Sequence, residues 1–255
     1  MRKRVREFNR KSNKVGSQGS NLESAPCLQT WSALEEHLIH KPDSIGTITV
    51  RASNEKKLRQ ILDQYSMSGT TVRVSDEIGS PIAAELRVNE YTEDELFDAL
   101  NFEKPRIIVM LDQITDTRNL GSIARTAAFF GIKWMIMPRD RQASITTATL
   151  SAAQGAFAHV NSATVVNLAR VIDRLKDELN YWVIGTAMQG EPIKNLIGQY
   201  DHVVVILGNE ATGMRSLTAK KCDRITTIPG HETRVESLNI AVAAGICLHE
   251  LSSSR

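Results

Sequence analysis

Three polar stretches, each following a short apolar run, hold the side chains of this chain that could do chemistry. The first stretch contains Asn119 and Arg125, the second contains Glu210, and the third contains Ser237 and Asn239. Amide, hydroxyl and guanidinium groups donate hydrogen bonds, and a carboxylate accepts them. The carboxylate of Glu210 in its glycine loop suits a ligand with an amine or hydroxyls better than a triphosphate.

The second stretch, residues 207–215, has the glycine spacing of a phosphate-binding loop but lacks its cation. Gly208 and Gly213 follow the pattern G-x-x-x-x-G, which in phosphate loops continues with lysine and then serine or threonine. Here Met214 takes the place of the lysine, and Arg215 comes one residue late. A triphosphate would find no counter-ion at this position, so nucleotide hydrolysis stays the less favoured alternative.

Each stretch also has a purely structural explanation. Asn119 can cap a helix that begins at about Leu120, and Arg125 can be one partner of a surface ion pair. Gly121 indicates a close approach by a ligand or by another backbone segment. The residues after Asn239 are apolar on nearly every side of a helix, which is typical of a helix buried in the core or against a second subunit.

The elements around these stretches predict an α/β fold with a parallel sheet. Short apolar runs, typical of strands buried on both faces, alternate with helical patterns. The expected strands are 106–111, 134–137, 160–165, 181–185, 203–207 and 224–228, and the expected helices are 121–130, 167–179, 216–221 and 237–251. Ligands bind such sheets at the carboxyl ends of their strands, which is where the three polar stretches fall.

The first half of the chain predicts a separate, smaller α/β domain over residues 26–102. Residues 31–39 and 55–65 have helical spacing, and Gly69 is expected to end the second helix. Strands are expected at 45–50 and 70–74, and an acidic amphipathic helix at 90–100 leads to a junction near 101–105. The second domain is expected over residues 103–255.

Composition excludes several classes of protein. Of the 255 residues, 42% are hydrophobic and 24% charged, enough apolar content to build a core and to exclude disorder over the whole chain. No apolar run approaches the roughly 18–20 residues of a membrane helix, and the N-terminus lacks the apolar region of a signal peptide, so we expect a cytoplasmic protein. The cysteines Cys27, Cys222 and Cys247 form no C-x-x-C pair and are expected to be free thiols.

Positive charge is concentrated at the N-terminus. Residues 1–25 contain seven of the 31 basic side chains but only two of the 29 acidic ones, so the remainder has a net charge of −3. This polar segment, with Gly16, Ser17, Gly19 and Ser20, is predicted to be a flexible tail. It is either a mobile arm that binds phosphates or a solubilising extension.

Taken together, the three stretches resemble the signature motifs of the SpoU–TrmH family of RNA ribose 2′-O-methyltransferases, in the SPOUT superfamily. Asn119, Gly121 and Arg125 match the first motif, residues 207–210 with Gly213 the second, and residues 228–229 with 235–239 the third. Local stretches such as 138–141 and 185–187 are similar to the RlmB-type branch, which methylates a guanosine ribose in large-subunit ribosomal RNA. Residues 26–102 are similar, more weakly, to that branch's RNA substrate-binding domain.

The resemblance implies a deep trefoil knot, a homodimer and S-adenosylmethionine as the cofactor, with no metal in the reaction. The implied cofactor-binding residues are Gly208, Ile228 and Leu238, joined by Asn209, Pro229 and Thr186. The implied catalytic residues are Arg125, Asn119, Glu210, Ser237 and Asn239. Thr117 stands where the family usually has proline, and Gly230 replaces the usual methionine after Ile228-Pro229.

Within this resemblance, several roles and substrates stay open. Arg125 is expected to orient the ribose or its phosphate and to stabilise developing alkoxide charge, because a guanidinium is a poor general base. Glu210 either accepts the proton or holds Arg125 or Asn119. Transfer RNA is the competing substrate, and a non-catalytic RNA-binding protein on the same fold is the rival function.

Deleting residues 1–20 is expected to weaken RNA binding and to flatten its salt dependence. The tail's basic side chains would release counterions from RNA phosphates, and that release sets the slope of affinity against salt. Filter binding at several salt concentrations measures the slope, and titration with S-adenosylmethionine serves as the control that should not change. An unchanged slope would contradict the phosphate-binding role.

Overall fold

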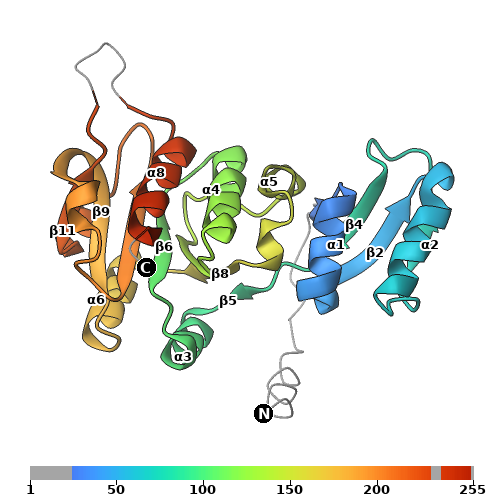
Figure 1. Ribbon diagram of the computed structural model, residues 1–255, viewed down its shortest axis with the longest axis horizontal. Coiled ribbons are helices and arrows are strands. Elements are labelled where there is room, and N and C mark those ends of the chain that lie inside the picture. The colour runs from blue at the N-terminus through green and yellow to red at the C-terminus, as the bar shows by residue number, and fades with distance from the viewer. Residues whose placement is uncertain (1–24, 231–236, 254–255) are drawn as a thin grey trace.

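The computed structural model describes residues 25–230 and 237–253, whose strands form two separate sheets (Figure 1). The larger sheet carries the polar stretches, and the smaller one lies at the opposite end of the molecule, at the right of Figure 1. The basic tail predicted for residues 1–25 lies outside the described residues, apart from Ala25.

The larger sheet confirms the predicted parallel α/β architecture. Its seven strands all pair in parallel, in the order β11-β9-β10-β6-β7-β8-β5. In that order they are β11 (Arg224–Thr227), β9 (Trp182–Pro192), β10 (Val203–Gly208), β6 (Ile107–Asp112), β7 (Trp134–Pro138), β8 (Asn161–Val165) and β5 (Glu90–Tyr91). Every residue of β6, β7 and β10 is buried, as expected for strands that helices cover on both faces.

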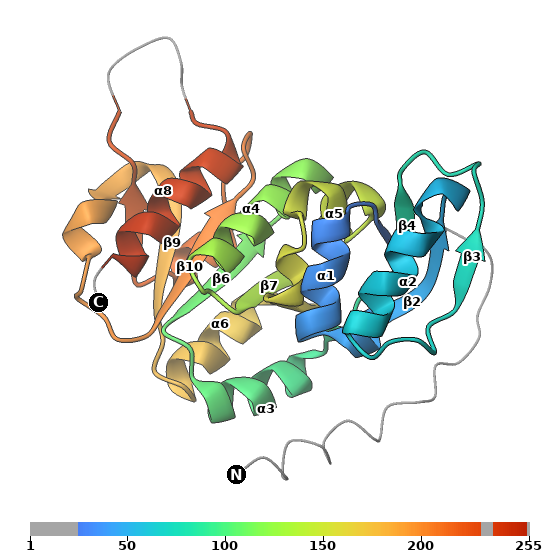
Figure 2. The same ribbon diagram turned by 45° about the vertical axis from the view of Figure 1, so that its right-hand side comes forward.

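Alternate side chains of these strands enter two different cores. Val109 and Leu111 of β6 pack with α4 (Thr117–Phe129), α5 (Thr147–Ala153) and α8 (Ile240–Ser252). Ile108 and Met110 face the opposite side and pack with α3 (Glu93–Glu103) and α6 (Leu168–Asp177). Figure 2 shows α4 and α8 side by side on one face. The short helix α7 (Ser216–Lys221) contacts α6.

Helix α4 begins earlier than the sequence predicts. Asp116, rather than Asn119, is the N-cap, and its carboxylate accepts a hydrogen bond from the backbone N–H of Arg118 at 2.7 Å. The predicted capping role of Asn119 is therefore wrong. Because Asn119 lies inside the first turn, its side chain is free to contact residues outside the helix.

The smaller sheet has the order β1-β4-β2-β3, and only β2 and β3 pair in parallel. Its strands are β1 (Cys27–Leu28), β2 (Ile45–Val50), β3 (Val72–Val74) and β4 (Ile82–Leu86), and its helices are α1 (Trp31–His40) and α2 (Glu55–Gln64). Leu34 of α1 and Leu58 of α2 are buried in one core with Ile48 and Ile82. The segment therefore has the predicted α/β character.

Residues 90–103 pack differently from the expectation. Glu90 and Tyr91 form β5 at the edge of the larger sheet, and the helix expected from residue 90 starts at Glu93. Thr92 caps that helix in a reciprocal pair with Glu95, which explains the later start. Residues 90–103 thus join the larger sheet and its core, not the smaller sheet.

Replacing Gly121 by alanine is expected to destabilise the fold by about 1–3 kcal/mol, because the new methyl group overpacks a helix contact. A Cβ at this position of α4 would lie 2.4 Å from the backbone oxygen of Thr149 in α5 and 2.7 Å from Cβ of Ala152. Urea unfolding measures the change. The control is Gly69→Ala, where a Cβ meets nothing within 4 Å, and equal effects of both substitutions would contradict the argument.

None of the helices in residues 25–230 and 237–253 combines the length and the apolar character that a membrane span requires.

Candidate active site

A polar cluster forms where the N-termini of α4 and α8 meet the loop after β10. The carboxylate oxygen Oε1 of Glu210 accepts hydrogen bonds from Nδ2 of Asn119 at 3.2 Å, from Nδ2 of Asn239 at 2.8 Å and from the backbone N–H of Ile240 at 3.0 Å. Nδ2 of Asn239 also donates to Oδ1 of Asn119 at 3.1 Å. Residues 119, 210 and 239, far apart in the sequence, therefore share one site.

Asn239 reaches this cluster because it is the N-cap of α8. Its Oδ1 accepts a hydrogen bond from the backbone N–H of Ala241 at 2.9 Å, which leaves its Nδ2 to donate to the cluster. The cluster thus ties the start of α8 to the start of α4. Farther along the two helices, the rings of Phe130 and His249 lie 5.9 Å apart.

The loop after β10 is a tight turn that Asn209 organises. Asn209 and Gly213 exchange two backbone hydrogen bonds, and Gly213 has a φ of +67°, which favours glycine. The Asn209 side chain accepts from the backbone N–H groups of Ala211 and Thr212 and donates to the backbone oxygen of Gln113 at 2.9 Å. Asn209 therefore holds the glycine loop in place against the loop that follows β6.

Asp112 is a second anchor of this loop that is not among the residues predicted from the sequence. Its carboxylate is completely buried at the end of β6 and accepts hydrogen bonds from Arg215, from Nε at 2.6 Å and from the backbone N–H at 2.9 Å. In the sequence, a carboxylate directly after an apolar run already indicated a buried charge that needs a partner. Its partner could not be identified because Arg215 is 103 residues away.

Replacing Arg215 by alanine is expected to destabilise the protein by about 3 kcal/mol and to weaken cofactor binding, because the buried carboxylate of Asp112 loses its cation. Because the side chain of Arg215 is 40% exposed, the expected loss of unfolding free energy lies at the low end of the range for breaking a buried ion pair. Urea unfolding and calorimetric titration measure the two effects. The control Lys220→Ala removes an exposed cation from the neighbouring α7 and should change neither quantity.

A cavity of about 810 Å³ opens beside the polar cluster. Most of the predicted site residues line it, namely Thr186, Gly208, Asn209, Glu210, Ile228, Pro229, Ser237 and Leu238. The remaining walls, which were not predicted as site residues, include Ala187, Met188, Thr226, Thr227, Ala243, Ile246 and Cys247. Among the described lining residues only Glu210 is charged, so the cavity suits a cationic ligand and does not suit a triphosphate.

One wall of the cavity comes from an irregularity that the sequence does not reveal. The pairing of β11 with β9 jumps from Gly185 to Glu191, so residues 186–190 bulge out of the ladder. The hydroxyl of Thr227 donates to the backbone oxygen of Met188 at 3.0 Å and holds the bulge. At the start of the bulge, the hydroxyl of Thr186 donates a hydrogen bond to the backbone oxygen of Ile206 at 2.9 Å.

The cysteine thiols do not supply chemistry to this cavity. All three are free, as expected, and Cys247 is buried. Burial, with a smaller contribution from Glu250, raises the pKa of the Cys247 thiol to about 12. The thiol is therefore protonated at neutral pH and acts as an apolar wall.

Arg125 is not part of the cluster within one chain. It lies six residues beyond Asn119 in α4, about 9 Å farther along the helix axis, and its side chain is exposed. Its guanidinium forms no hydrogen bond or ion pair with the residues that the structure describes. Of the five predicted catalytic residues, the chain thus unites Asn119, Glu210 and Asn239, places Ser237 on the cavity wall and leaves Arg125 outside.

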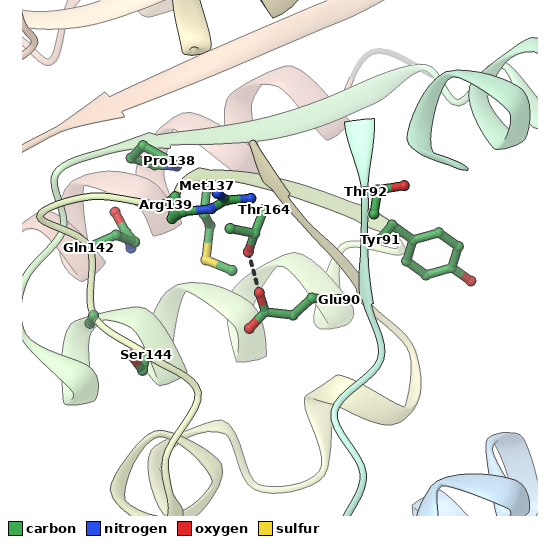
Figure 3. A pocket seen from close by; sticks show the side chains of 10 residues that line it. Glu90, Tyr91, Thr92, Met137, Pro138, Arg139, Gln142, Ser144 and Thr164 are labelled. Carbon is green, nitrogen blue, oxygen red and sulfur yellow. Dashed lines mark hydrogen bonds between the residues drawn. The ribbon is translucent and has the colours of Figure 1, made fainter. Parts of the chain in front are cut away.

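A second, smaller cavity of about 390 Å³ lies at the ends of β7 and β8 (Figure 3). Glu90 of β5 reaches across it and accepts a hydrogen bond from the hydroxyl of Thr164 (Figure 3). Arg139 and Gln142 line its other sides. None of the predicted site residues lines this cavity, so the larger cavity is the candidate active site.

Comparisons with known proteins agree with the geometry. A family model described as the SpoU rRNA methylase family matches residues 106–249. The chain is 34% identical over 242 residues to the 23S rRNA (guanosine-2′-O-)-methyltransferase RlmB of Bordetella pertussis, covering 90% of this chain and 97% of that protein. It is 40% identical over 155 residues to the protein of the same name from Neisseria meningitidis, covering 61% of each chain.

The fold also matches solved structures. The SpoU methyltransferase AviRb of Streptomyces viridochromogenes, in complex with the cofactor AdoMet, superposes with a TM-score of 0.75 at 20% identity over 89% of both chains. At that identity the match supports the fold alone. The family model and the long alignment to a relative carry the assignment, and the chain therefore belongs to the SpoU rRNA methylase family and is an S-adenosylmethionine-dependent RNA methyltransferase.

Proposed function

We propose that the protein transfers a methyl group from S-adenosylmethionine to the ribose 2′-hydroxyl of a guanosine in large-subunit ribosomal RNA, in the cytoplasm. Relatives that align with nine-tenths of the chain carry this activity in their names. The observation that carries the proposal is the cluster of Asn119, Glu210 and Asn239 beside a cavity whose only described charge is a carboxylate.

The cofactor would occupy the larger cavity. Gly208, Ile228 and Leu238 would hold it through their backbones, with Asn209, Pro229 and Thr186 shaping the walls. Bound S-adenosylmethionine supplies an electrophilic methyl group on a positively charged sulfur. The carboxylate of Glu210, in a described lining that is otherwise uncharged, suits the positive charge on the sulfur. The side chains of Ala243, Ile246 and Cys247 offer apolar contact to the rest of the cofactor.

Glu210 acts as a positioning residue in this proposal. One of its carboxylate oxygens already accepts three hydrogen bonds, from Asn119, Asn239 and the backbone of Ile240. The two amides are thereby held beside the cavity, next to Glu210, where we place the ribose. Fixed orientation can contribute on the order of 7–11 kcal/mol to such a bimolecular step at best.

Arg125 would orient the ribose or its phosphate and stabilise the negative charge that develops as the 2′-hydroxyl loses its proton. Because Arg125 lies outside the cluster of its own chain, we propose that it acts in the active site of a partner subunit. Ser237, exposed on the cavity wall, would add a hydroxyl donor near the same oxygen.

A homodimer through α4 and α8 is part of this proposal. Phe129 of α4 is 83% exposed, and Val242 and Leu238, on and next to α8, are 52% and 46% exposed. The two helices contact each other, and Arg125 lies one turn before Phe129 on the exposed face of α4. A second copy covering this face would bury the apolar side chains and bring its own Arg125 toward the cavity.

We also propose that the C-terminal part is threaded as a trefoil knot. Strand β11 is the edge strand of the larger sheet and pairs with β9. Helix α8, which follows β11 in the chain, nevertheless packs against α4, β10 and the short helix η4 (Ile193–Leu196). This return past the segment between β9 and β10 supports the threading. The smaller domain and the basic tail would provide the RNA-binding surface.

Mapping of 2′-O-methyl groups tests the function. In ribosomal RNA from a deletion strain we expect one guanosine to lose its 2′-O-methyl group and to regain it when the purified protein and labelled S-adenosylmethionine are added. Loss of a 2′-O-methyl group from transfer RNA instead would identify transfer RNA as the substrate and contradict the choice of ribosomal RNA. Binding of RNA with no methyl transfer would identify a non-catalytic RNA-binding protein and overturn the proposal.

A further inference from the structure

Three side chains that commonly bind metals meet at the junction of the two domains, far from the candidate active site. Glu36 and His40 lie on α1 of the smaller domain, and His159 follows the short helix η3 (Ala156–Ala158) of the larger one. Nε2 of His159 lies 2.7 Å from Oε2 of Glu36, and Nε2 of His40 lies 3.7 Å from the same oxygen. The three ligand atoms all lie within 4.8 Å of one another.

We propose that Glu36, His40 and His159 form a zinc-binding site that fastens the smaller domain to the larger one. Two imidazoles and one carboxylate are a common protein ligand set for Zn²⁺, which prefers nitrogen and oxygen ligands at about 2.0–2.2 Å in tetrahedral geometry. Water would complete the fourth position. Mg²⁺ and Ca²⁺ prefer oxygen ligands and do not fit the two imidazoles.

The two distances from Glu36 are close to those that coordination needs. Two ligands on a tetrahedral zinc ion are about 3.3 Å apart at these bond lengths. The Glu36–His159 contact at 2.7 Å would open slightly, and the Glu36–His40 contact at 3.7 Å would close slightly. The ligand nitrogens of His40 and His159, which lie within 4.8 Å of each other, would also be drawn together by rotation of their side chains. Without the ion, Nε2–H of His159 would donate to the Glu36 carboxylate; with the ion, His159 would carry its proton on Nδ1 and offer the Nε2 lone pair to zinc.

The backbone around the three ligands is held from both sides. Glu36 and His40 are one helical turn apart, so they share a face of α1. Gly155, with a φ of +90°, lets the larger domain approach α1, since a Cβ there would lie 3.2 Å from Cα of Ala33. The ligands from the two domains are thus brought together without the ion.

Lys41, next to His40, fastens the other side of the site. Its ammonium group donates hydrogen bonds to the backbone oxygens of Phe157 and Val160, at 2.9 and 3.1 Å, and to Oδ1 of Asn161 at 3.0 Å. These bonds flank His159 in the sequence and fix its backbone. They also direct the positive charge of Lys41 toward carbonyl oxygens instead of the proposed ion.

The site is accessible and locally favourable to a cation. The side chains of Glu36, His40 and His159 are 39%, 45% and 40% exposed, so an ion can enter and retain a water. Among the described residues no other His, Cys, Asp or Glu triad has this arrangement.

Calorimetric titration of zinc chloride into the full chain, freed of metal by a chelator, tests the site without RNA or cofactor. We expect one zinc ion per chain, and His159→Ala and Glu36→Gln each to lower its affinity by at least about tenfold. His249→Ala, which removes a histidine of α8, is the control and should leave binding unchanged. Binding by His159→Ala as tight as that of the unsubstituted chain would overturn the proposal.

Thermal unfolding gives a second readout that separates a lost ligand from a lost fold. Zinc should raise the unfolding midpoint of the unsubstituted chain, because an ion that binds only the folded state stabilises it. Each ligand variant should unfold cooperatively without zinc and show no rise with it. An equal rise in the His159→Ala variant would mean that zinc binds elsewhere. Neither experiment depends on methyl transfer, so its outcome is independent of the proposed function.

Discussion

Replacing Arg125 by alanine is expected to lower kcat for RNA methylation by about 10²–10³, the usual effect of losing one donor that stabilises a developing oxyanion. The dissociation constant for S-adenosylmethionine should stay the same, because the role proposed for Arg125 is toward the ribose and its phosphate and not toward the cofactor. Replacing Arg125 by lysine should lower kcat by at least about tenfold, since lysine keeps the charge but lacks the planar pair of donors. Transfer of a tritiated methyl group at saturating RNA measures kcat.

Arg118→Ala is the matched control for this prediction. Arg118 is also an exposed arginine of α4, two turns before Arg125, and its only recorded partner among the described residues is Asp116. Its removal could affect RNA affinity through lost charge, but kcat should stay near that of the unsubstituted enzyme. An Arg125→Lys variant with normal kcat would contradict the role assigned to the guanidinium.

Two inactive variants combined in one dimer are expected to restore activity. If Arg125 of one subunit serves the cluster of the other, a dimer of an Arg125→Ala chain and a Glu210→Ala chain contains one site with both residues intact. In a statistical mixture, about a quarter of all sites would be active. Coexpression of the two chains with different affinity tags, followed by methyl-transfer assays, measures the recovery.

Each outcome of the mixing experiment has a distinct meaning. If Arg125 acted within its own chain, every site in the mixture would lack one of the two residues and no activity would return. Each variant alone must be inactive, and each must still form dimers by analytical ultracentrifugation. Phe129→Glu, which places a charge on the proposed interface, should give monomers and abolish recovery in any mixture.

The sequence was informative about the larger sheet because its strands are buried on both faces. A strand such as β10, with six buried residues, shows as a continuous apolar run that few other elements produce. The polar residues after β6 and β10 were located for the same reason. The sequence predicted element boundaries less well where short polar elements adjoin. Glu90 and Tyr91, for example, form a strand of two residues just before the N-cap of a helix.

Some parts of the site had no local signal. The bond between Asp112 and Arg215 joins residues from two loops, and neither residue type predicts the other. The bulge at residues 186–190 depends on how β9 pairs with β11. The meeting of Glu36 and His40 with His159 depends on how α1 packs against the segment that contains η3. Each is a contact between segments that the chain order leaves far apart.

By itself, the sequence determined the kinds of group available: two amides, a carboxylate and a guanidinium at the carboxyl ends of parallel strands, without the lysine of a phosphate loop. The tertiary structure decided which of them meet. It joined Asn119, Glu210 and Asn239 and left Arg125 on an exposed helix face. The physical reason is that local pattern fixes which face of an element is buried, whereas the packing of distant elements fixes the hydrogen-bonding distances within the site.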